Sequence, residues 1–497
     1  MWPFNNKKKT LEDTANINRL DPYGYAAWAT IDTLQWNGAE KTGVHFGFAQ
    51  NNIMNINEPN TWFKKNRSIT VGGEIGPVMY SAPNQHTLVC APTRAGKTAG
   101  ILIPTLLTYQ HSVLAIDPKG ELSAVTAARR KAIGQKVIVL NPWNLHTQAL
   151  SPFGPHSFNP LDLIDVNDPN AVSNAMLLSS LLIVPGSDPD DFWNQSAAGL
   201  ITGLILYVAA NEAPITRTLS TLRHLLTQGE AALNQLFADM AASTLFHGSI
   251  AETGRCFLDM EARPRSSVLA TARTQTDFLR DPVIRNALEK STFSLAALKE
   301  TPSTVYLVIP PDQLTVHGRW LRLMVGAAIK VFQSEPRPKH RCLFILEEFP
   351  SLGPMSAIET GVATLAGYGV DFLFAIQNLG QLEKLYKQGA ATFLANSAFK
   401  YFTAINDLDT AKYVSSILGT QTITVNSDSL NAEGDQTVSS HLSSRPLKLP
   451  EELMAIGSGQ GFLIRPSGNP IRIKPRLYHQ AATLSELVAS NPFHQKP

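Results

Sequence analysis

The chain has 497 residues, of which 44% are hydrophobic and 16% charged, a balance typical of a folded protein and not of a disordered one. This length exceeds one ordinary hydrophobic core and predicts two or three structural units. The net charge is +2, so no strong overall field favours nucleic acid. Any such contact must come from local patches or from a ring of subunits that concentrates them.

Cysteine usage and hydropathy indicate a cytoplasmic protein. Cys90, Cys256 and Cys342 are too few for a disulfide framework and lack metal-ligand spacing. We expect Cys90 and Cys342, which lie in apolar runs, to be buried. The longest apolar stretch, residues 197–210, is shorter than the roughly 20 residues that cross a bilayer and predicts a buried helix. The N-terminus has a basic triplet but no apolar core after it, so it is not a secretory signal.

Short apolar runs bounded by turn residues predict buried strands. They lack strict alternation, which is typical of strands covered on both faces in a mostly parallel sheet. The runs lie at residues 87–90, 112–117, 136–140, 304–309, 342–346, 371–377, 400–405 and 461–465. From 167 to 300 the pattern is instead helical, at 172–182, 192–211, 219–226 and 231–242, and no strand run interrupts it.

We therefore predict an α/β protein with a mostly parallel central sheet at residues 71–166 and 301–497 and an inserted all-α domain at 167–300. Residues 1–70 form a polar lead-in segment with little periodicity. Residues 427–441 are polar and contain glycine, which predicts a mobile loop.

Residues 91–98 (APTRAGKT) lie between a predicted strand and a predicted helix, the context that a phosphate-binding loop requires. Backbone amides at the helix start would cradle phosphates, Lys97 would reach the β- and γ-phosphates, and the Thr98 hydroxyl would bind Mg²⁺. The nucleotide-binding residues would be Thr93, Arg94, Ala95, Gly96, Lys97 and Thr98. Ala91 replaces the usual first glycine but adds only a methyl group. The alternative is a Gly-Lys-Thr at an arbitrary helix start.

Two carboxylates, Glu347 and Glu348, follow the predicted strand at 342–346. The carboxyl end of a buried parallel strand lies at the ligand-binding edge of the sheet. Glu347 would hold Mg²⁺ together with Thr98, directly or through water, and Glu348 would orient and deprotonate the attacking water. Glu347 stands where aspartate is usual, and a solvated strand end is the alternative for the pair.

Gln377 ends the predicted strand at 371–377. A polar amide there could sense the γ-phosphate and couple hydrolysis to movement. The alternative is an ordinary cap or turn residue at a strand end.

Six runs carry a resemblance, at residues 91–98, 103–107, 117–121, 347–353, 366–369 and 445–447. Together they resemble the type IV coupling proteins, ATPases of bacterial conjugation and type IV secretion, and the resemblance extends from about Gly24 to Tyr478. It implies that the α/β part is a RecA-like P-loop nucleotide-binding domain with an all-helical insert, that ATP and Mg²⁺ are the ligands, and that a homo-hexamer is the working state. The implied substrates are a relaxase with single-stranded DNA, or secreted effector proteins. These would be handed to the channel ATPases and inner-membrane components of a secretion apparatus.

The resemblance also assigns residues. The family's phosphate-loop, acidic-pair and downstream glutamine roles fall on Lys97, Thr98, Glu347, Glu348 and Gln377. Asp117 and Glu121 match a family run without a role that the sequence defines, and a strand end followed by a turn explains Asp117 equally well.

Two departures from the family pattern stand out. Most members carry two transmembrane helices before the motor, whereas this chain has no such span. Recruitment to the inner membrane would then depend on partners, or the protein is a cytoplasmic variant of the family. Some members place an arginine before a Gly-Tyr-Gly-like turn to complete a neighbour's ATP site, where this chain has Ala366. Arg445 and Arg94 are candidate substitutes, although surface arginines are usually just solvated.

Six arginines lie between residues 255 and 285, at Arg255, Arg263, Arg265, Arg273, Arg280 and Arg285. Four acidic residues among them leave a mild local charge, so a solvated helix face and a contact with DNA or relaxase both stay open. For the whole chain the leading hypothesis is an ATP-driven coupling motor. The alternatives are a nucleotide-binding substrate adaptor with little hydrolysis, and a DNA-pumping ATPase unrelated to secretion.

Overall fold

A computed structural model of the chain describes residues 24, 26–29, 43–50, 78–184, 191–430 and 436–494. Its main feature is one 11-stranded sheet of order β2-β1-β13-β12-β9-β3-β8-β7-β4-β6-β5. Neighbouring strands from β9 to β5 in this order run parallel, and those from β9 to β2 run antiparallel. The fold is the predicted α/β class with a mostly parallel central sheet.

The strands at the eight predicted runs are all present. They are β3 (His86–Cys90), β4 (Ser112–Asp117), β5 (Lys136–Leu140), β6 (Ser303–Val308), β7 (Cys342–Leu346), β8 (Val370–Ile376), β9 (Ser397–Thr403) and β12 (Gly461–Ile464). Most are buried along their whole length, which explains why their sequences do not alternate. Cys90 and Cys342 are buried as expected.

Helices cover both faces of the sheet, because successive strand side chains point to opposite sides. Leu88, Leu114 and Phe344 belong to one hydrophobic core with α13 (Leu314–Gln333), α15 (Leu379–Tyr386) and α17 (Leu408–Leu418). Their chain neighbours on the same strands belong to a second core with α2 (Ile103–Thr108) and α3 (Glu121–Ala132). Shorter helices complete the layers: α4 (Thr147–Leu150), α14 (Ser356–Gly361), α16 (Ala390–Asn396), α18 (Pro450–Met454) and α19 (Ala482–Ser485).

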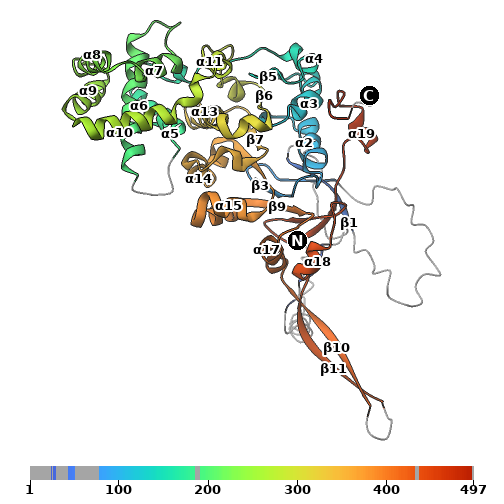
Figure 1. Cartoon of the computed structure of the whole chain (residues 1–497). Helices are drawn as coiled ribbons and strands as arrows, with labels where there is room; N and C mark the ends of the chain where they lie inside the picture. Colours follow the sequence, from blue (N-terminus) through green and yellow to red (C-terminus); the bar gives the residue numbers. More distant parts are fainter. Residues whose placement is uncertain are drawn as a thin grey trace, which may run out of the picture.

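Only helical elements occur among the described residues between β5 and β6. In Figure 1, α5 to α10 stand beside the sheet as a separate group, whereas α4 lies next to α3. The α-helices are α5 (Ala171–Leu182), α6 (Phe192–Asn211), α7 (Leu219–Leu226), α8 (Glu230–Ala241), α9 (Ser249–Asp259), α10 (Ala262–Gln275), α11 (Pro282–Leu288) and α12 (Ala297–Glu300). We call α5 to α12 the helical insert.

The apolar run at 197–210 lies in α6, the central helix of the insert. Leu200, Ile201, Leu204 and Ile205 are completely buried, as the sequence predicts for a core helix. In the part of the chain that the structure describes, no helix is long and apolar enough to cross a membrane.

One prediction about an irregular segment is wrong. Residues 427–430 and 436–441, expected in a mobile loop, belong to a two-stranded antiparallel ladder of β10 (Thr420–Leu430) and β11 (Gln436–Pro446). This ladder projects from the body of the molecule in Figure 1. Its threonines favour extended backbone, but the segment lacks the apolar alternation that marks a half-buried strand. Residues 431–435 lie outside the described part.

The lead-in segment also contains structure that the sequence pattern does not predict. β1 (His45–Gln50) pairs with β13 (Ile471–Lys474) and β2 (Val78–Tyr80) and extends the sheet. β1 is buried on both faces, and its pairing with β2 is irregular next to Gly47, whose φ is 110°. A short buried strand with a glycine at an irregularity carries no period that could be recognised in isolation. Most other residues of 1–70 lie outside the described part.

Candidate functional site

The predicted phosphate loop follows β3 and leads into a helix that starts as a π-helical turn, η3 (Thr98–Leu102). Gly96 has a φ of 82°, a conformation that glycine adopts without the steric cost of a β-carbon. Ala91 does not have a positive φ. Its amide donates to the Ile376 carbonyl at 3.0 Å. The alanine therefore occupies its position without the strain that a left-handed backbone would impose.

The acidic pair lies next to this loop in space. Glu347 follows β7, and its Oε1 accepts a hydrogen bond of 2.8 Å from the Thr98 hydroxyl. Burial, with the nearby negative charge of Asp117, raises the pKa of Glu347 to about 7, while the Thr98 hydrogen bond and the charge of Lys97 oppose the shift. The structure thus brings Lys97 and Thr98 next to Glu347. Thr98 and Glu347 are 249 positions apart in the chain.

Glu348 contacts Gln377, the predicted γ-phosphate sensor. Gln377, at the end of β8, donates from Nε2 to Glu348 Oε1 at 3.0 Å. β7 and β8 are parallel neighbours, so their carboxyl ends meet at one edge of the sheet. Glu348 and Gln377 therefore lie side by side at this edge.

Asp117 has a local structural role that the sequence leaves open. Its carboxylate is completely buried and accepts hydrogen bonds from the amides of Leu122 and Ser123 at 3.2 and 2.8 Å, and from the Ser123 hydroxyl at 2.7 Å. Burial raises the pKa of Asp117, and these hydrogen bonds oppose the shift. The side chain therefore satisfies free amides at the start of α3.

A C-terminal segment that the sequence analysis did not single out lies against the phosphate loop. Leu477 Cδ2 is 3.6 Å from where a β-carbon on Gly96 would stand. The Tyr478 amide donates to the Ala99 carbonyl at 3.0 Å. Further along, Asn491 Nδ2 donates to Glu121 Oε1 at 2.7 Å. No local motif marks this contact, because it depends on the chain returning across the sheet after β13.

The family model for Type IV secretory system Conjugative DNA transfer matches residues 45–496. The chain belongs to this family. The resemblance to type IV coupling proteins on the six sequence runs is thereby confirmed.

Curated relatives of this coupling-protein family align along most of the chain. The Protein VirD4 of Rhizobium radiobacter is 28% identical over 483 residues, which cover 94% of this chain and 65% of that protein. The Conjugal transfer protein TraG of Escherichia coli is 29% identical over 399 residues, covering 74% of this chain and 61% of that protein. The chain thus spans less than two thirds of the length of these relatives.

Solved coupling-protein structures share the fold. The unbound monoclinic form of the bacterial conjugative coupling protein TrwBdeltaN70 has a TM-score of 0.62 at 17% identity, covering 80% of this chain and 86% of that one. The plasmid coupling protein TrwB in complex with ADP and Mg²⁺ has a TM-score of 0.60 at 16% identity, covering 79% and 85%. At this identity the likeness concerns the fold alone.

The arginines considered for a neighbour's ATP site are placed differently in this coupling protein. Arg445 pairs with Glu452 at 2.7 Å near the base of the β10–β11 ladder. Arg94 is exposed in the phosphate loop with a φ of 65°. The Ala366 carbonyl accepts a hydrogen bond of 3.4 Å from Arg341, which also pairs with Asp371. Of the two candidates, Arg94 is the one without a recorded ion pair among the described residues.

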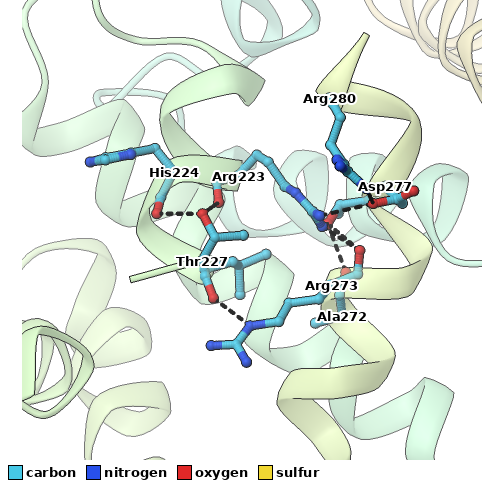
Figure 2. A network of polar contacts seen from close by, with 9 residues as sticks. Arg223, His224, Thr227, Ala272, Arg273, Asp277 and Arg280 are labelled. Carbon is cyan, nitrogen blue, oxygen red and sulfur yellow. Dashed lines mark hydrogen bonds and ion pairs between the residues drawn. The ribbon is translucent and has the colours of Figure 1, made fainter. Parts of the chain in front are cut away.

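Several arginines of the helical insert make ion pairs and hydrogen bonds with other residues of the insert. Figure 2 shows Arg223 and Arg280 converging on Asp277, at 3.0 and 3.5 Å, while Arg273 Nε donates to the Leu226 carbonyl at 2.7 Å. Arg273 and Arg223 also line a cavity of about 440 Å³ between the insert and α13, away from the phosphate loop. Arg223 and Arg273 are thus engaged inside the insert, whereas Arg255, Arg263 and Arg285 are exposed on it.

Proposed function

We propose that the chain is a magnesium-dependent ATPase motor. It would recruit a relaxase–DNA complex or effector proteins and deliver them to a type IV secretion channel as a homo-hexamer. The observation that carries the proposal is the pair of contacts at one sheet edge, Thr98 to Glu347 at 2.8 Å and Gln377 to Glu348 at 3.0 Å. Family membership supports the secretion context and argues against a DNA pump unrelated to secretion.

The donor set at this edge fits magnesium. Thr98 and Glu347 offer a hydroxyl and a carboxylate, the oxygen ligands that a hard cation prefers. Within the described residues, no group of three or more His, Cys, Asp or Glu could hold a metal ion. Two protein ligands suit Mg²⁺ that completes its shell with nucleotide phosphates and water. TrwB, which shares the fold, was solved with a non-hydrolysable ATP analogue and with ADP and Mg²⁺.

Each residue then has a role in hydrolysis. The amides of residues 93–98 and the ammonium of Lys97 bind the phosphates, and bound Mg²⁺ supplies neutralisation of phosphate charge. Glu348 accepts a proton from the attacking water, and Gln377 orients the Glu348 carboxylate.

We assign the motor to residues 71–166 and 301–497 and substrate recruitment to the insert at 167–300. The sheet strands from β3 onward fall in the first two ranges and α5 to α12 fall in the third. Recruitment to the inner membrane would proceed through protein partners.

Steady-state ATP hydrolysis with and without single-stranded DNA tests the proposal. Lys97→Ala should abolish binding of Mg-nucleotide, and Glu348→Gln should bind it but hydrolyse at least about 100-fold more slowly, the usual loss for a removed general base. The controls are Lys290→Ala and Glu289→Gln, exposed residues of the insert. Equal background rates in every form, with nucleotide still bound, would contradict the motor and favour a nucleotide-binding adaptor.

A further inference from the structure

Arg322 is a buried arginine outside the predicted site. It lies on α13, the helix that follows β6, and only 3% of its surface is exposed. Burial lowers its pKa to about 10, so it is still charged at neutral pH. The salt bridges among the described residues do not include it, and its recorded partners are backbone carbonyls. A buried charge without a carboxylate depends on such charge-assisted hydrogen bonds.

These carbonyls come from two separate segments. On one side, Arg322 Nη1 donates to the carbonyls of Leu352 and Pro354, at 2.9 and 2.6 Å. On the other, Nε donates to the Leu181 carbonyl at 3.1 Å and Nη2 to that of Ser180 at 3.5 Å. One rigid guanidinium therefore joins the segment after the acidic pair to the last turn of α5 in the helical insert.

The segment after the acidic pair is a stiff connection to Glu348. It forms a 3-10 turn, η9 (Phe349–Leu352), in which the Ser351 amide donates to the Glu348 carbonyl at 2.9 Å. Phe349 is completely buried and stacks on Tyr386. One short turn, anchored by a buried aromatic side chain, therefore joins Glu348 to Leu352.

α13 packs closely on both segments because of two glycines. A β-carbon on Gly318 would stand 3.0 Å from the Ser351 carbonyl oxygen, and one on Gly326 would overlap the Leu181 side chain. One turn before Arg322, Arg319 Nε donates to the Leu182 carbonyl at 3.2 Å and Nη2 to Gln275 Oε1 of α10 at 2.6 Å. Arg319 thus caps the same end of α5 but has no recorded hydrogen bond to η9.

We infer that Arg322 is a positioning residue that links the Glu348 segment to the helical insert, so that a nucleotide-dependent shift of Glu348 moves α5. The inference rests on the proposed function, because it takes Glu348 to respond to bound nucleotide. From α5 the movement continues into α6, since Ser179 Oγ donates to the Ala198 carbonyl at 3.0 Å.

The test compares Arg322→Lys with the matched control Arg319→Lys in the full-length chain. Lysine keeps the charge but presents a single ammonium that cannot hold both pairs of carbonyls in the fixed geometry of the fork. Arg322→Lys should lower kcat for ATP roughly 10- to 100-fold with KM nearly unchanged, because small misplacements of a catalytic group cost rates of this order. It should also lose the change in amide hydrogen exchange of α5 caused by a non-hydrolysable Mg-ATP analogue. Arg319→Lys should keep both.

Three outcomes would overturn the link. Arg322→Lys could match the wild type in kcat and in the exchange response, or the two variants could lose both in equal measure, which would indicate general weakening of the α5 junction. Absence of nucleotide uptake by the wild type would overturn the link together with the proposed function. A wild type that binds nucleotide but does not hydrolyse it would contradict only the proposed motor activity, because the hydrogen-exchange response of α5 still tests the link through Arg322.

Discussion

Glu348 stands in a left-handed backbone conformation, with φ of 56° and ψ of 47°. This conformation costs a residue with a β-carbon about 1–2 kcal/mol. It persists because the surrounding contacts define it: buried Phe349 follows it, and Gln377 holds its carboxylate. Strain of this kind concentrates at functional sites, which agrees with the proposed role of Glu348 as general base.

The Glu347 carboxyl should make metal binding depend on pH. Its pKa is raised to about 7 by burial and by Asp117, and a metal binds only the ionised form. We expect affinity for Mg-ADP to rise as pH increases from 6 to 7 and to level off above about 7.5, by up to about tenfold per pH unit in the rising part. Isothermal titration at several pH values measures this.

The control for this pH dependence is Glu347→Gln in the same buffers, because the nucleotide's own phosphates also titrate in this range. The variant should bind Mg-ADP weakly, with only the pH dependence of the nucleotide itself. Identical pH profiles for the wild type and the variant would show that Glu347 does not ionise on metal binding.

Most residues at the candidate site could be predicted from the sequence because they follow strands. Glu347 and Gln377 directly follow buried strands, and Lys97 and Thr98 end the loop that follows a third. Parallel pairing brings the carboxyl ends of such strands to one edge. Arg322 could not be found this way. It lies within a helix, and its partners are backbone carbonyls, which every residue type carries. Leu477 likewise reaches the phosphate loop only through the return of the chain.

At the scale of elements, α13 depends on Gly326 for its approach to α5. A methyl group there would overlap Leu181, and overpacking of this kind costs about 1–3 kcal/mol. Gly326→Ala should therefore lower the melting temperature, and Leu181→Ala in the same chain should restore part of the loss by making room. Differential scanning calorimetry of the single and double variants measures the coupling.

Gly199 provides the matched control for this packing argument. It also lies inside a helix, α6, but a β-carbon there would have no neighbour within 4 Å among the described residues. Gly199→Ala should raise stability by roughly 0.5–1 kcal/mol, the ordinary gain of alanine over glycine in a helix. Equal destabilisation by the two substitutions would mean that helix–helix distance at Leu181 is not the cause.

Helices and strands could be predicted from the sequence where burial produces a recognisable pattern of apolar residues. The strands of the parallel region are buried on both faces and bounded by turns, and α6 and α7 have the ends that their apolar residues predict. β1 is short and pairs irregularly, and β13 alternates over only four residues. The β10–β11 ladder pairs polar residues whose register depends on hydrogen bonds and not on an apolar face.

At the scale of the whole molecule, the β10–β11 ladder is a separate two-stranded sheet. Its base is tied to the body, because the Ala26 amide donates to the Thr420 carbonyl at 2.8 Å and the Thr422 amide to the Gly24 carbonyl at 3.0 Å. Beyond the base it projects away from both hydrophobic cores in Figure 1. The outer part should accordingly contribute little to the stability of the rest.

Shortening the ladder tests this independence. Asn426 and Ser440 are paired in register, so residues 427–439 can be replaced by an Asn-Gly pair, which favours a two-residue hairpin turn. The shortened chain should melt within about 2 °C of the full one, as surface changes usually shift stability by less than about 0.5 kcal/mol, and it should bind Mg-nucleotide equally well. A large drop in melting temperature would mean that the outer part of the ladder makes contacts that stabilise the rest of the fold. If both properties are kept but DNA-stimulated hydrolysis is lost, the ladder serves the working assembly and not the fold of the single chain.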